Sequence, residues 1–437
     1  MPLEARERLL REPLPREGAD PRELLEAVGR DVLPYPLGHV HPRFFGWVNP
    51  PAAPLAVLGE LLAAGMNSSV AGGDQAATYV EHAVLSWLKE IVGFPMDAGA
   101  LLVSGGSLAA IVGLAVMRHV KAQTGAMRAR GLHAEPAPMV VYTSAQAHSC
   151  IDKAVELLGI GSDFLRRVPV DADYRMDVDQ LASRIATDRR DGLHPVAVVG
   201  SAGTVNTGAI DPLDRIADLC AREDLWFHVD GAYGGVGVLA EAVRPLLSGM
   251  ERADSLGIDP HKWLYIPAEC GCVLVRDAAA MQATFSTVPP YLQDDRALPW
   301  FSELGPQQTR GFRALKLWLA MKQIGVEGYQ RLISRDIALA ALLREKITAR
   351  PDLELVAGGP LGITCFRVAP AGASDLDALN RRVLRLVQEE GEVYLTSTLL
   401  DGRFVLRANV MDFRTDEADL DALLDAIARG GRKARTT

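Results

Sequence analysis

The stretch that decides the fold reads WFHVDGAYGG at residues 226–235 and, after a short interval, ADSLGIDPHKWLYIPAECGCVLVR at residues 253–276. It contains short apolar runs, and similar runs precede it, such as MVVYT at residues 139–143 and VAVVG at residues 196–200. These runs are apolar throughout rather than at alternate positions. That pattern is typical of strands that are buried on both faces.

Helical patterns separate the apolar runs along the middle of the chain. The expected strands are 101–104, 139–143, 196–201, 225–229, 255–258 and 271–275, and the expected helices are 76–92, 107–122, 150–158 and 213–222. Strands that alternate with helices in this way form a mostly parallel sheet covered on both faces. The sequence therefore predicts an α/β fold with a mostly parallel sheet in its large domain.

The two ends of the chain have a different character. The first 75 residues are rich in Pro and Gly, contain one amphipathic helical candidate at residues 54–66, and are not expected to form a compact domain alone. A long helical pattern at 308–324 leads to the strand patterns LGITCFRV and GRFVLRANV, flanked by helical patterns at 375–388 and 415–428. These patterns are typical of a smaller C-terminal α+β domain.

The predicted organisation is an N-terminal segment, a large domain and a small domain, at residues 1–75, 76–325 and 326–437. The basic tail RGGRKARTT at residues 429–437 is expected to be a frayed, solvated end.

Composition limits the possible partners and location. The chain has 437 residues and a formal net charge of -9, which argues against a nucleic-acid or membrane-surface role. The N-terminus alternates charges and prolines without an apolar signal region, and the apolar run at 108–117 is too short to span a bilayer. We therefore expect a cytoplasmic protein that binds neither nucleic acid nor membrane.

Five scattered cysteines in a long chain are typical of reduced thiols rather than of a disulfide framework. Cys270 and Cys272 are one residue apart on an expected strand, so their side chains should point to opposite faces. This spacing disfavours a metal site, and we predict buried small side chains and no bound metal.

Two polar side chains follow the apolar strands and can supply chemistry. Asp230 ends one strand, and Lys262 stands beside His261 after another. A buried lysine next to a positively biased site can lose its proton and form a Schiff base, and a carboxylate at a strand end can keep a pyridinium nitrogen protonated. Pyridoxal phosphate most needs these two protein groups. The alternatives are a surface lysine, disfavoured by the apolar residues that follow Lys262, and an aspartate that caps a turn.

The motif Asp259-Pro260-His261-Lys262-Trp263, together with Asp230 and the small residues after it, resembles the pyridoxal-phosphate-dependent decarboxylases of the aromatic-amino-acid, glutamate and histidine decarboxylase group. The resemblance covers nearly the whole chain, from His41 to Arg407. It implies a fold-type I homodimer with pyridoxal 5'-phosphate near the subunit interface, and an N-terminal segment that interlocks with the partner. It also implies that Lys262 is the Schiff-base lysine and that Asp230 pairs with the pyridine nitrogen.

The resemblance assigns three more residues to the cofactor. It implies that His148 stacks on the cofactor ring and that Ala232 lies under the opposite face, where a larger side chain would displace the ring. His261 would pack beside the phosphate or the substrate carboxylate. Without the matching motifs, His148 would be read as a helix-capping residue and His261 as a structural histidine.

A glycine-rich turn, Ser104-Gly105-Gly106-Ser107, lies between an expected strand and an expected helix. Its glycines let the backbone close around an anion, and the helix N-terminus adds unpaired N–H groups and a favourable dipole. We predict a phosphate cradle at Gly105, Gly106 and Ser107.

Two segments near the expected cofactor depart from the family pattern. Thr204 matches a hydrogen-bonding residue of the family, with turn formation as the alternative, but Val205 replaces a second threonine found in many relatives. Asp259 stands where several relatives carry asparagine near the phosphate. An acidic group would repel the phosphate, so Asp259 is not counted among the phosphate ligands.

The substrate side of the site is less well marked. In the family a tyrosine on a loop, here Tyr291, reaches the partner subunit's site and donates a proton to Cα after carbon dioxide leaves; an ordinary exposed tyrosine is the alternative. Trp47 matches a wall of the substrate pocket, or else belongs to interface core. Ala268 stands where animal aromatic decarboxylases carry a large aromatic residue, so the side-chain pocket is expected to differ in shape, and Asn67-Ser68-Ser69 of the other subunit could add polar contacts.

The function that the resemblance implies is decarboxylation of an L-amino acid, most plausibly an aromatic one, to the amine and carbon dioxide. Lys262, Asp230, His148 and Tyr291 would carry the chemistry. The alternatives are an aldehyde synthase that couples decarboxylation to oxidation, another lyase reaction such as β-elimination on the same scaffold, and a catalytically silent binding protein.

Overall fold

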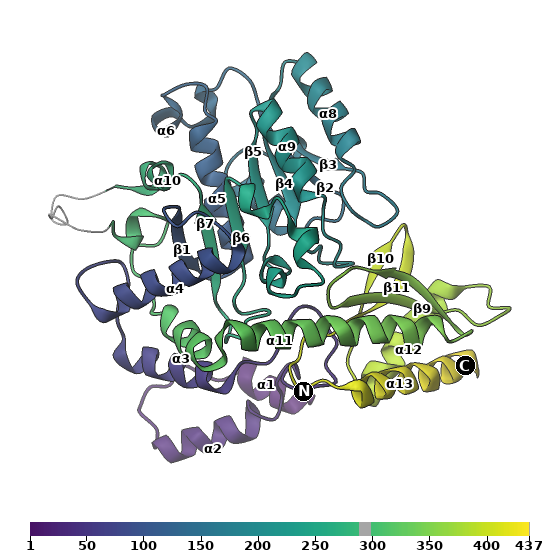
Figure 1. Ribbon diagram of the computed structural model, residues 1–437. Helices are drawn as coiled ribbons and strands as arrows, with labels where there is room; N and C mark the ends of the chain where they lie inside the picture. The colour runs from purple at the N-terminus through teal and green to yellow at the C-terminus, as the bar shows by residue number, and fades with distance from the viewer. Residues whose placement is uncertain (288–298, 437) are drawn as a thin grey trace.

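The structure is a computed structural model that describes residues 1–287 and 299–436 (Figure 1). Tyr291 lies outside the described residues. Among the described helices, none is long and apolar enough to cross a membrane.

The large domain is built around a seven-stranded sheet of order β1-β7-β6-β5-β4-β2-β3. The neighbouring strands from β6 to β3 pair in parallel, and β7 runs antiparallel to both of its neighbours. The predicted, mostly parallel sheet is confirmed. Its strands are β1 (Gly99–Val103), β2 (Met139–Ser144), β3 (Leu165–Val168), β4 (His194–Ser201), β5 (Trp226–Asp230), β6 (Ser255–Ile258) and β7 (Gly271–Val275).

Helices cover the two faces of this sheet, as Figure 1 shows. Gly113 of helix α5 packs on His228 of β5, whereas the adjacent Phe227 lies on the opposite face with Leu213 of α9 near Gly200. The α-helices of the chain are α1 (Leu3–Leu10), α2 (Pro21–Asp31), α3 (Pro54–Met66), α4 (Ala76–Val92), α5 (Gly106–Val120), α6 (Met127–Arg130), α7 (Cys150–Leu157), α8 (Val178–Arg190), α9 (Leu213–Glu223), α10 (Ala278–Phe285), α11 (Ala314–Thr348), α12 (Leu376–Glu390) and α13 (Glu417–Thr436).

Short 3-10 helices make several of the connections: η1 (Gly131–Ala134), η2 (Ser162–Phe164), η3 (Gly235–Leu239), η4 (Arg244–Leu247), η5 (Met250–Arg252) and η7 (Phe301–Glu303).

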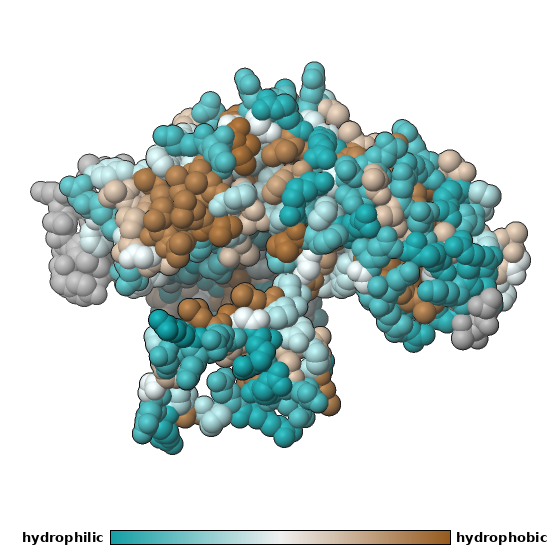
Figure 2. All heavy atoms as spheres, turned by 90° about the horizontal axis from the view of Figure 1, so that it is seen from below, coloured by the Kyte–Doolittle hydropathy of each residue, from teal (hydrophilic) through white to brown (hydrophobic). Residues whose placement is uncertain are grey.

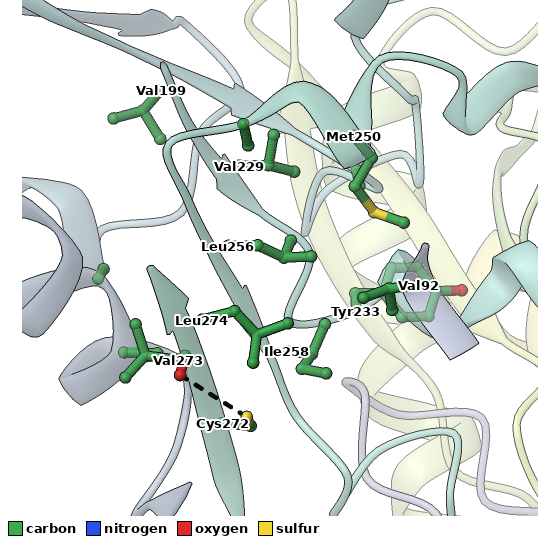
Figure 3. Packing of buried hydrophobic residues seen from close by; sticks show 14 of the residues in the cluster. Val92, Val199, Val229, Tyr233, Met250, Leu256, Ile258, Cys272, Val273 and Leu274 are labelled. Carbon is green, nitrogen blue, oxygen red and sulfur yellow. Dashed lines mark hydrogen bonds between the residues drawn. The ribbon is translucent and has the colours of Figure 1, made fainter. Parts of the chain in front are cut away.

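The core follows the apolar runs of the sequence. Every residue of β1, β2, β6 and β7 is buried, as expected for strands covered on both faces. Figure 3 shows apolar side chains of β4, β5, β6 and β7 side by side, with Met250 and Tyr233 beside them. Cys270 and Cys272 are fully buried, and all five cysteines are free, so the prediction of buried, reduced thiols is confirmed.

A second sheet forms the C-terminal part of the chain. It has the order β10-β11-β9-β8 and is antiparallel throughout. The 35-residue helix α11 runs from the large sheet to this smaller one (Figure 1), and its regular backbone is broken at Gly325. These strands are β8 (Leu353–Gly358), β9 (Ile363–Val368), β10 (Thr396–Leu400) and β11 (Arg403–Asn409). The domain boundaries at 75/76 and 325/326 stay a prediction.

The expectation for the basic tail is wrong. Helix α13 continues to Thr436, and Gly430 and Ala434 are buried in the small domain. A Cβ on Gly430 would lie 3.1 Å from Val387 of α12. Ile427, Gly430 and Ala434 recur at helical spacing, so the small residues between the basic ones continue the packed face of the helix.

The N-terminal segment exposes an unusual amount of apolar surface. In Figure 1, α2 lies along the lower edge of the molecule, with α1 and α3 above it. Figure 2 shows a patch of apolar side chains over α3 on the underside of the molecule. The large apolar side chains exposed on α3 are Val57, Leu58, Leu61, Leu62 and Met66. A patch of this kind indicates an interaction surface.

Candidate active site

The candidate site lies where several strands of the large sheet end. Ser144, Ser201 and Asp230 are the last residues of β2, β4 and β5, and Asp259 follows β6. Ligands of open α/β sheets bind at this carboxyl edge. A cavity of about 450 Å³ opens there. Its lining includes most of the predicted site residues: Trp47, Gly105, Gly106, Ser107, His148, Thr204, Asp230, Ala232, His261 and Lys262.

Lys262 is paired with a carboxylate in this cavity. Its Nζ lies 2.9 Å from Asp259 Oδ2, and its side chain is 21% exposed. Burial lowers the pKa of Lys262, but the charge and hydrogen bond of Asp259 and the charge of Asp230 raise it more, so the net direction is upward. The expectation that Lys262 occupies a positively biased site is therefore wrong, because two carboxylates surround it.

The loop that carries Lys262 is anchored to the long helix α11. Trp263 Nε1 and Tyr265 Oη donate to the same oxygen of Asp336, at 3.0 and 2.7 Å. Tyr329 of the same helix donates to the backbone carbonyl of Leu264 at 3.0 Å. These bonds fix the residues after Lys262 and so restrict where its side chain can reach.

Asp336 gives the folded protein a specific pH dependence. Burial raises its pKa from 3.8 to about 7, although the bonds from Tyr265 and Trp263 lower it. Between about pH 4 and pH 7 the unfolded chain has lost this proton while the folded protein keeps it, so the free energy of unfolding falls as pH rises. We expect this fall, about 1.4 kcal/mol per pH unit for one group, to be missing from Asp336→Asn in urea titrations between pH 5 and pH 8.

The control for this comparison is Asp425→Asn, which changes an exposed aspartate on α13. It should follow the native protein across the whole range. If the free energy of unfolding changed with pH in the same way for the native protein and Asp336→Asn, Asp336 would be ionised in the folded protein.

Asp230 points its carboxylate into the cavity between two small residues. Its Oδ1 accepts a bond from the backbone N–H of Ala232 at 3.2 Å, and Cys150 Sγ lies 3.9 Å from its Oδ2. Burial raises the pKa of Cys150, so the thiol stays neutral beside this carboxylate. Asp230 can therefore keep its charge available for a cationic ligand atom such as a protonated ring nitrogen.

His148 lies in the loop between β2 and α7 and is exposed to the cavity. Its Nδ1 accepts a hydrogen bond from the backbone N–H of Cys150 at 3.1 Å. That bond places the proton of a neutral His148 on Nε2. The residue thus has a capping contact, which was the alternative, and also a face toward the cavity.

The glycine turn before α5 is closely packed. A Cβ on Gly106 would lie 2.8 Å from Ala232 Cβ, and one on Gly271 would lie 2.5 Å from Gly105 Cα. Side chains at these positions would fill the space in front of the helix N-terminus. The N–H groups of the first turn have no intrahelical partner and can bind an anion there.

Thr204 is buried in the loop after β4. Its Oγ1 lies 2.9 Å from Thr207 Oγ1 and accepts from the backbone N–H of Ala209 at 3.2 Å. Either hydroxyl of this pair can be the donor, and when Thr207 donates, Thr204 still has its own proton to give. Thr204 can therefore both close the turn and donate to a ligand in the cavity.

Trp47 forms one wall of the cavity in a strained conformation. Its φ of 45° lies in the left-handed region. Its carbonyl accepts bonds from Arg407 Nη1 at 3.2 Å and Asn409 Nδ2 at 2.8 Å, both on β11. Its ring centroid lies 5.6 Å from that of Tyr394 and 6.0 Å from that of Phe44, and its side chain remains 43% exposed.

Not every predicted residue reaches this site. Ala268 is exposed and does not line the cavity, whereas the next residue, Glu269, does and pairs with Arg313 at 2.8 Å. Tyr291 is outside the described residues. Three residues near the site were not predicted from the sequence. Cys150 follows His148 by two positions, and this spacing could have identified it as a residue of the cavity. No local pattern in the sequence marks Asp336 or Arg407 as part of the site.

Comparisons with known proteins identify relatives along nearly the whole chain. The family described as the pyridoxal-dependent decarboxylase conserved domain matches residues 2–369. An aromatic-L-amino-acid decarboxylase of Bacillus atrophaeus is 36% identical over 423 residues, which cover 94% of this chain and 85% of the relative. An L-2,4-diaminobutyrate decarboxylase of Rhizobium meliloti is 33% identical over 432 residues, which cover 97% and 85%.

Solved structures agree with the sequence comparisons. The crystal structure of Oryza sativa TDC with PLP and tryptamine has a TM-score of 0.91 at 28% identity, covering 98% of this chain and 91% of that one. The crystal structure of mouse CSAD has a TM-score of 0.91 at 30% identity, covering 99% and 92%. The predicted fold class is confirmed.

Proposed function

The chain belongs to the pyridoxal-dependent decarboxylase family, and on this premise we propose that it converts an aromatic L-amino acid to the amine and carbon dioxide. Its cofactor is pyridoxal 5'-phosphate, and it is a carboxy-lyase. The glycine turn and the lysine in a cavity of about 450 Å³ fit this cofactor.

The observation that carries the aromatic substrate is Trp47. Its half-exposed indole forms a wall of the cavity that contains Lys262, and Phe44 and Tyr394 back it. Aromatic rings pair favourably in stacked or edge-to-face arrangements. The sequence of the Bacillus relative, which is named for aromatic amino acids, supports the same substrate class.

The charges around the cavity support a substrate without an acidic side chain. Among the described lining residues there is no arginine, and Lys262 is the one lysine. A second carboxylate on the substrate would require a cationic partner. The one glutamate of the described lining, Glu269, is already paired with Arg313.

The roles that we propose for the chain's own residues follow from these contacts. Bound pyridoxal phosphate would supply an electron sink for the pair of electrons left on Cα when carbon dioxide departs. Lys262 would hold the cofactor covalently and release it to a substrate amine, Asp230 would keep the ring nitrogen protonated, and His148 and Ala232 would lie on either side of the ring. Gly105, Gly106 and Ser107 bind the phosphate through backbone N–H groups. Tyr291 returns a proton to Cα.

The test of the substrate class is an amino-acid panel with purified holoenzyme. We expect tryptophan, tyrosine or phenylalanine to be converted at least about ten-fold more efficiently, by kcat/KM, than glutamate or 2,4-diaminobutyrate, since a ring lost from an apolar wall costs more than 1.4 kcal/mol. Amine and carbon dioxide should form in equal amounts. A preference for 2,4-diaminobutyrate would overturn the aromatic assignment, and aldehyde with hydrogen peroxide as main products would make the chain an aldehyde synthase.

Trp47→Ala should remove this preference and leave the rate on small amino acids largely unchanged. Trp318→Ala, on α11 and outside the cavity lining, is the matched control.

We also propose that the active form is a homodimer. The exposed apolar face of α3 and the apolar side chains of α1 and α2 support a partner surface here, since a monomer rarely exposes so large a patch. A second copy of this chain is the occupant that the family resemblance implies. The net charge of -9 and the free cysteines support a cytoplasmic protein without nucleic-acid or membrane partners.

Hybrid dimers test both the dimer and Tyr291. Lys262→Ala and Tyr291→Phe subunits should each be inactive alone. Mixing them should restore up to about a quarter to a half of native activity, because a hybrid dimer has one site in which Lys262 comes from one subunit and Tyr291 from the other. The control mixes Lys262→Ala subunits with subunits of the double variant that carries both Lys262→Ala and Asp230→Asn. This mixture should restore no activity. Full activity in a sedimenting monomer would contradict the dimer.

A further inference from the structure

Asp259 is a buried carboxylate between Lys262 and the glycine turn. It is 4% exposed, its Oδ2 lies 2.9 Å from Lys262 Nζ, and its Oδ1 makes no hydrogen bond with any described residue. A Cβ on Gly106 would lie 3.1 Å from the same Oδ2. The carboxyl group thus contacts the lysine and lies next to the turn that we propose for the phosphate.

This position creates a charge problem for an ionised carboxylate. A phosphate held by the glycine turn brings negative charge to a site where Asp259 is already negative, and like charges in a buried site repel strongly. The neighbouring charge that balances Asp259 in the structure is the ammonium of Lys262. That balance is lost when Lys262 bonds to the cofactor.

Lys262 also needs a proton acceptor. An ammonium nitrogen has three donors and no electron pair, so it must lose a proton before it can bond to an aldehyde carbon. Because Asp259 and Asp230 raise the pKa of Lys262 more than burial lowers it, the lysine does not lose this proton readily near neutral pH. Asp259 Oδ2 is the acceptor within hydrogen-bond distance of Nζ.

We propose that Asp259 accepts the proton that Lys262 gives up on bonding to the cofactor, and remains a neutral carboxylic acid beside the phosphate. The proton moves from Nζ to Oδ2 along the 2.9 Å contact. It leaves a neutral amine with its electron pair and a neutral acid, so the transfer creates no net charge. The amine would then bond to the aldehyde carbon, and the carbonyl oxygen would leave as water with the two protons that remain on Nζ. The proposal rests on the proposed role of Lys262.

Among the described residues, no hydrogen bond joins Lys262 Nζ to another group that faces Asp259, whereas Asp259 Oδ2 lies 2.9 Å from it. His261 Nε2 lies 3.7 Å from Asp259 Oδ2, and its Nδ1 lies 2.6 Å from the carbonyl of Cys270. The thiols of Cys150, Cys270 and Cys272 also interact with Asp259, and burial raises the pKa of each, so they remain neutral.

Difference infrared spectroscopy tests the proposal directly. Pyridoxal phosphate is added to the full-length apoenzyme, and the carbonyl stretching band of a protonated carboxylic acid is followed. The band should appear in the native protein and in Asp230→Asn, and should be missing from Asp259→Asn and from Asp259→Ser. A native protein without the band, or a band that persists in both Asp259 variants, would overturn the proposal.

Cofactor capture gives a second measurement. The Asp259→Asn protein should form its visible absorbance band at least about ten-fold more slowly at neutral pH, with a rate that rises with pH, because a positioned base is lost. Both variants should still bind the cofactor at equilibrium. A capture rate equal to the native rate in both variants would contradict the role of Asp259.

Borohydride reduction followed by peptide mapping separates this proposal from the role of Lys262. A label on Lys262 without the infrared band removes Asp259 alone. A label on another lysine removes the lysine assignment and, with it, the proposal.

Discussion

Lys262→Ala is expected to end multiple turnover while the protein still folds and retains part of its cofactor. The lysine is the one lysine among the described lining residues of the cavity, so no other described side chain there can take its place. The phosphate turn and Asp230 remain, and they should hold the cofactor without a covalent bond. We expect steady-state decarboxylation to fall by at least about 10³-fold, as when one group of a catalytic set is removed.

The measurement is carbon dioxide release by native and variant holoenzyme, together with borohydride labelling. Lys153→Ala, which removes an exposed lysine of α7, is the control and should keep native activity and native labelling. Sustained turnover by Lys262→Ala would disprove its role as the lysine that binds the cofactor.

Asp230→Asn is expected to lower kcat by about 10²- to 10³-fold, the cost of removing one preorganised charge aimed at the reacting system. The amide keeps the shape of the side chain and can still accept the bond from the backbone of Ala232. It carries no charge to hold a proton on the ring nitrogen. Since this effect appears only as charge develops on Cα, kcat should fall much more than KM rises.

Steady-state kinetics at saturating cofactor distinguish these two effects. The control is Asp173→Asn, which changes an exposed aspartate distant in sequence from Asp230. It should behave like the native enzyme. A variant with nearly native kcat would remove Asp230 from the chemistry, and a variant with raised KM alone would make it a binding residue.

The part of the fold that could be predicted is the part in which local pattern and burial agree. Continuous apolar runs predicted β2, β4, β5, β6 and β7, because both faces of these strands are covered and their side chains are therefore apolar on both faces. Strand β3 and helix α8 were missed, since LRRV has two adjacent arginines between its apolar residues and the helix pattern is highly charged. The tail was misjudged because its basic residues concealed the small ones that pack.

The candidate site divides in the same way. Asp230 and Lys262 could be found because each follows directly after a strand end, and the glycine turn because it joins a strand to a helix. Asp336 and Arg407 could not, because their contacts to the site join segments that lie far apart in sequence. The charge around Lys262 was misjudged for a local reason: Asp259 lies only three residues earlier, but the conformation of the loop decides whether its carboxylate meets Nζ.

The bond between Asn409 and the carbonyl of Trp47 joins residues 362 positions apart. A ribosome that adds about 5 to 20 residues per second would separate the two partners by about 20 to 70 seconds of synthesis. During that interval the strained turn at Trp47 has no β11 to hold it, and the apolar N-terminal helices are already outside the ribosome. The wall that Trp47 gives the cavity can therefore complete its contacts with β11 only after residue 409 has been synthesised.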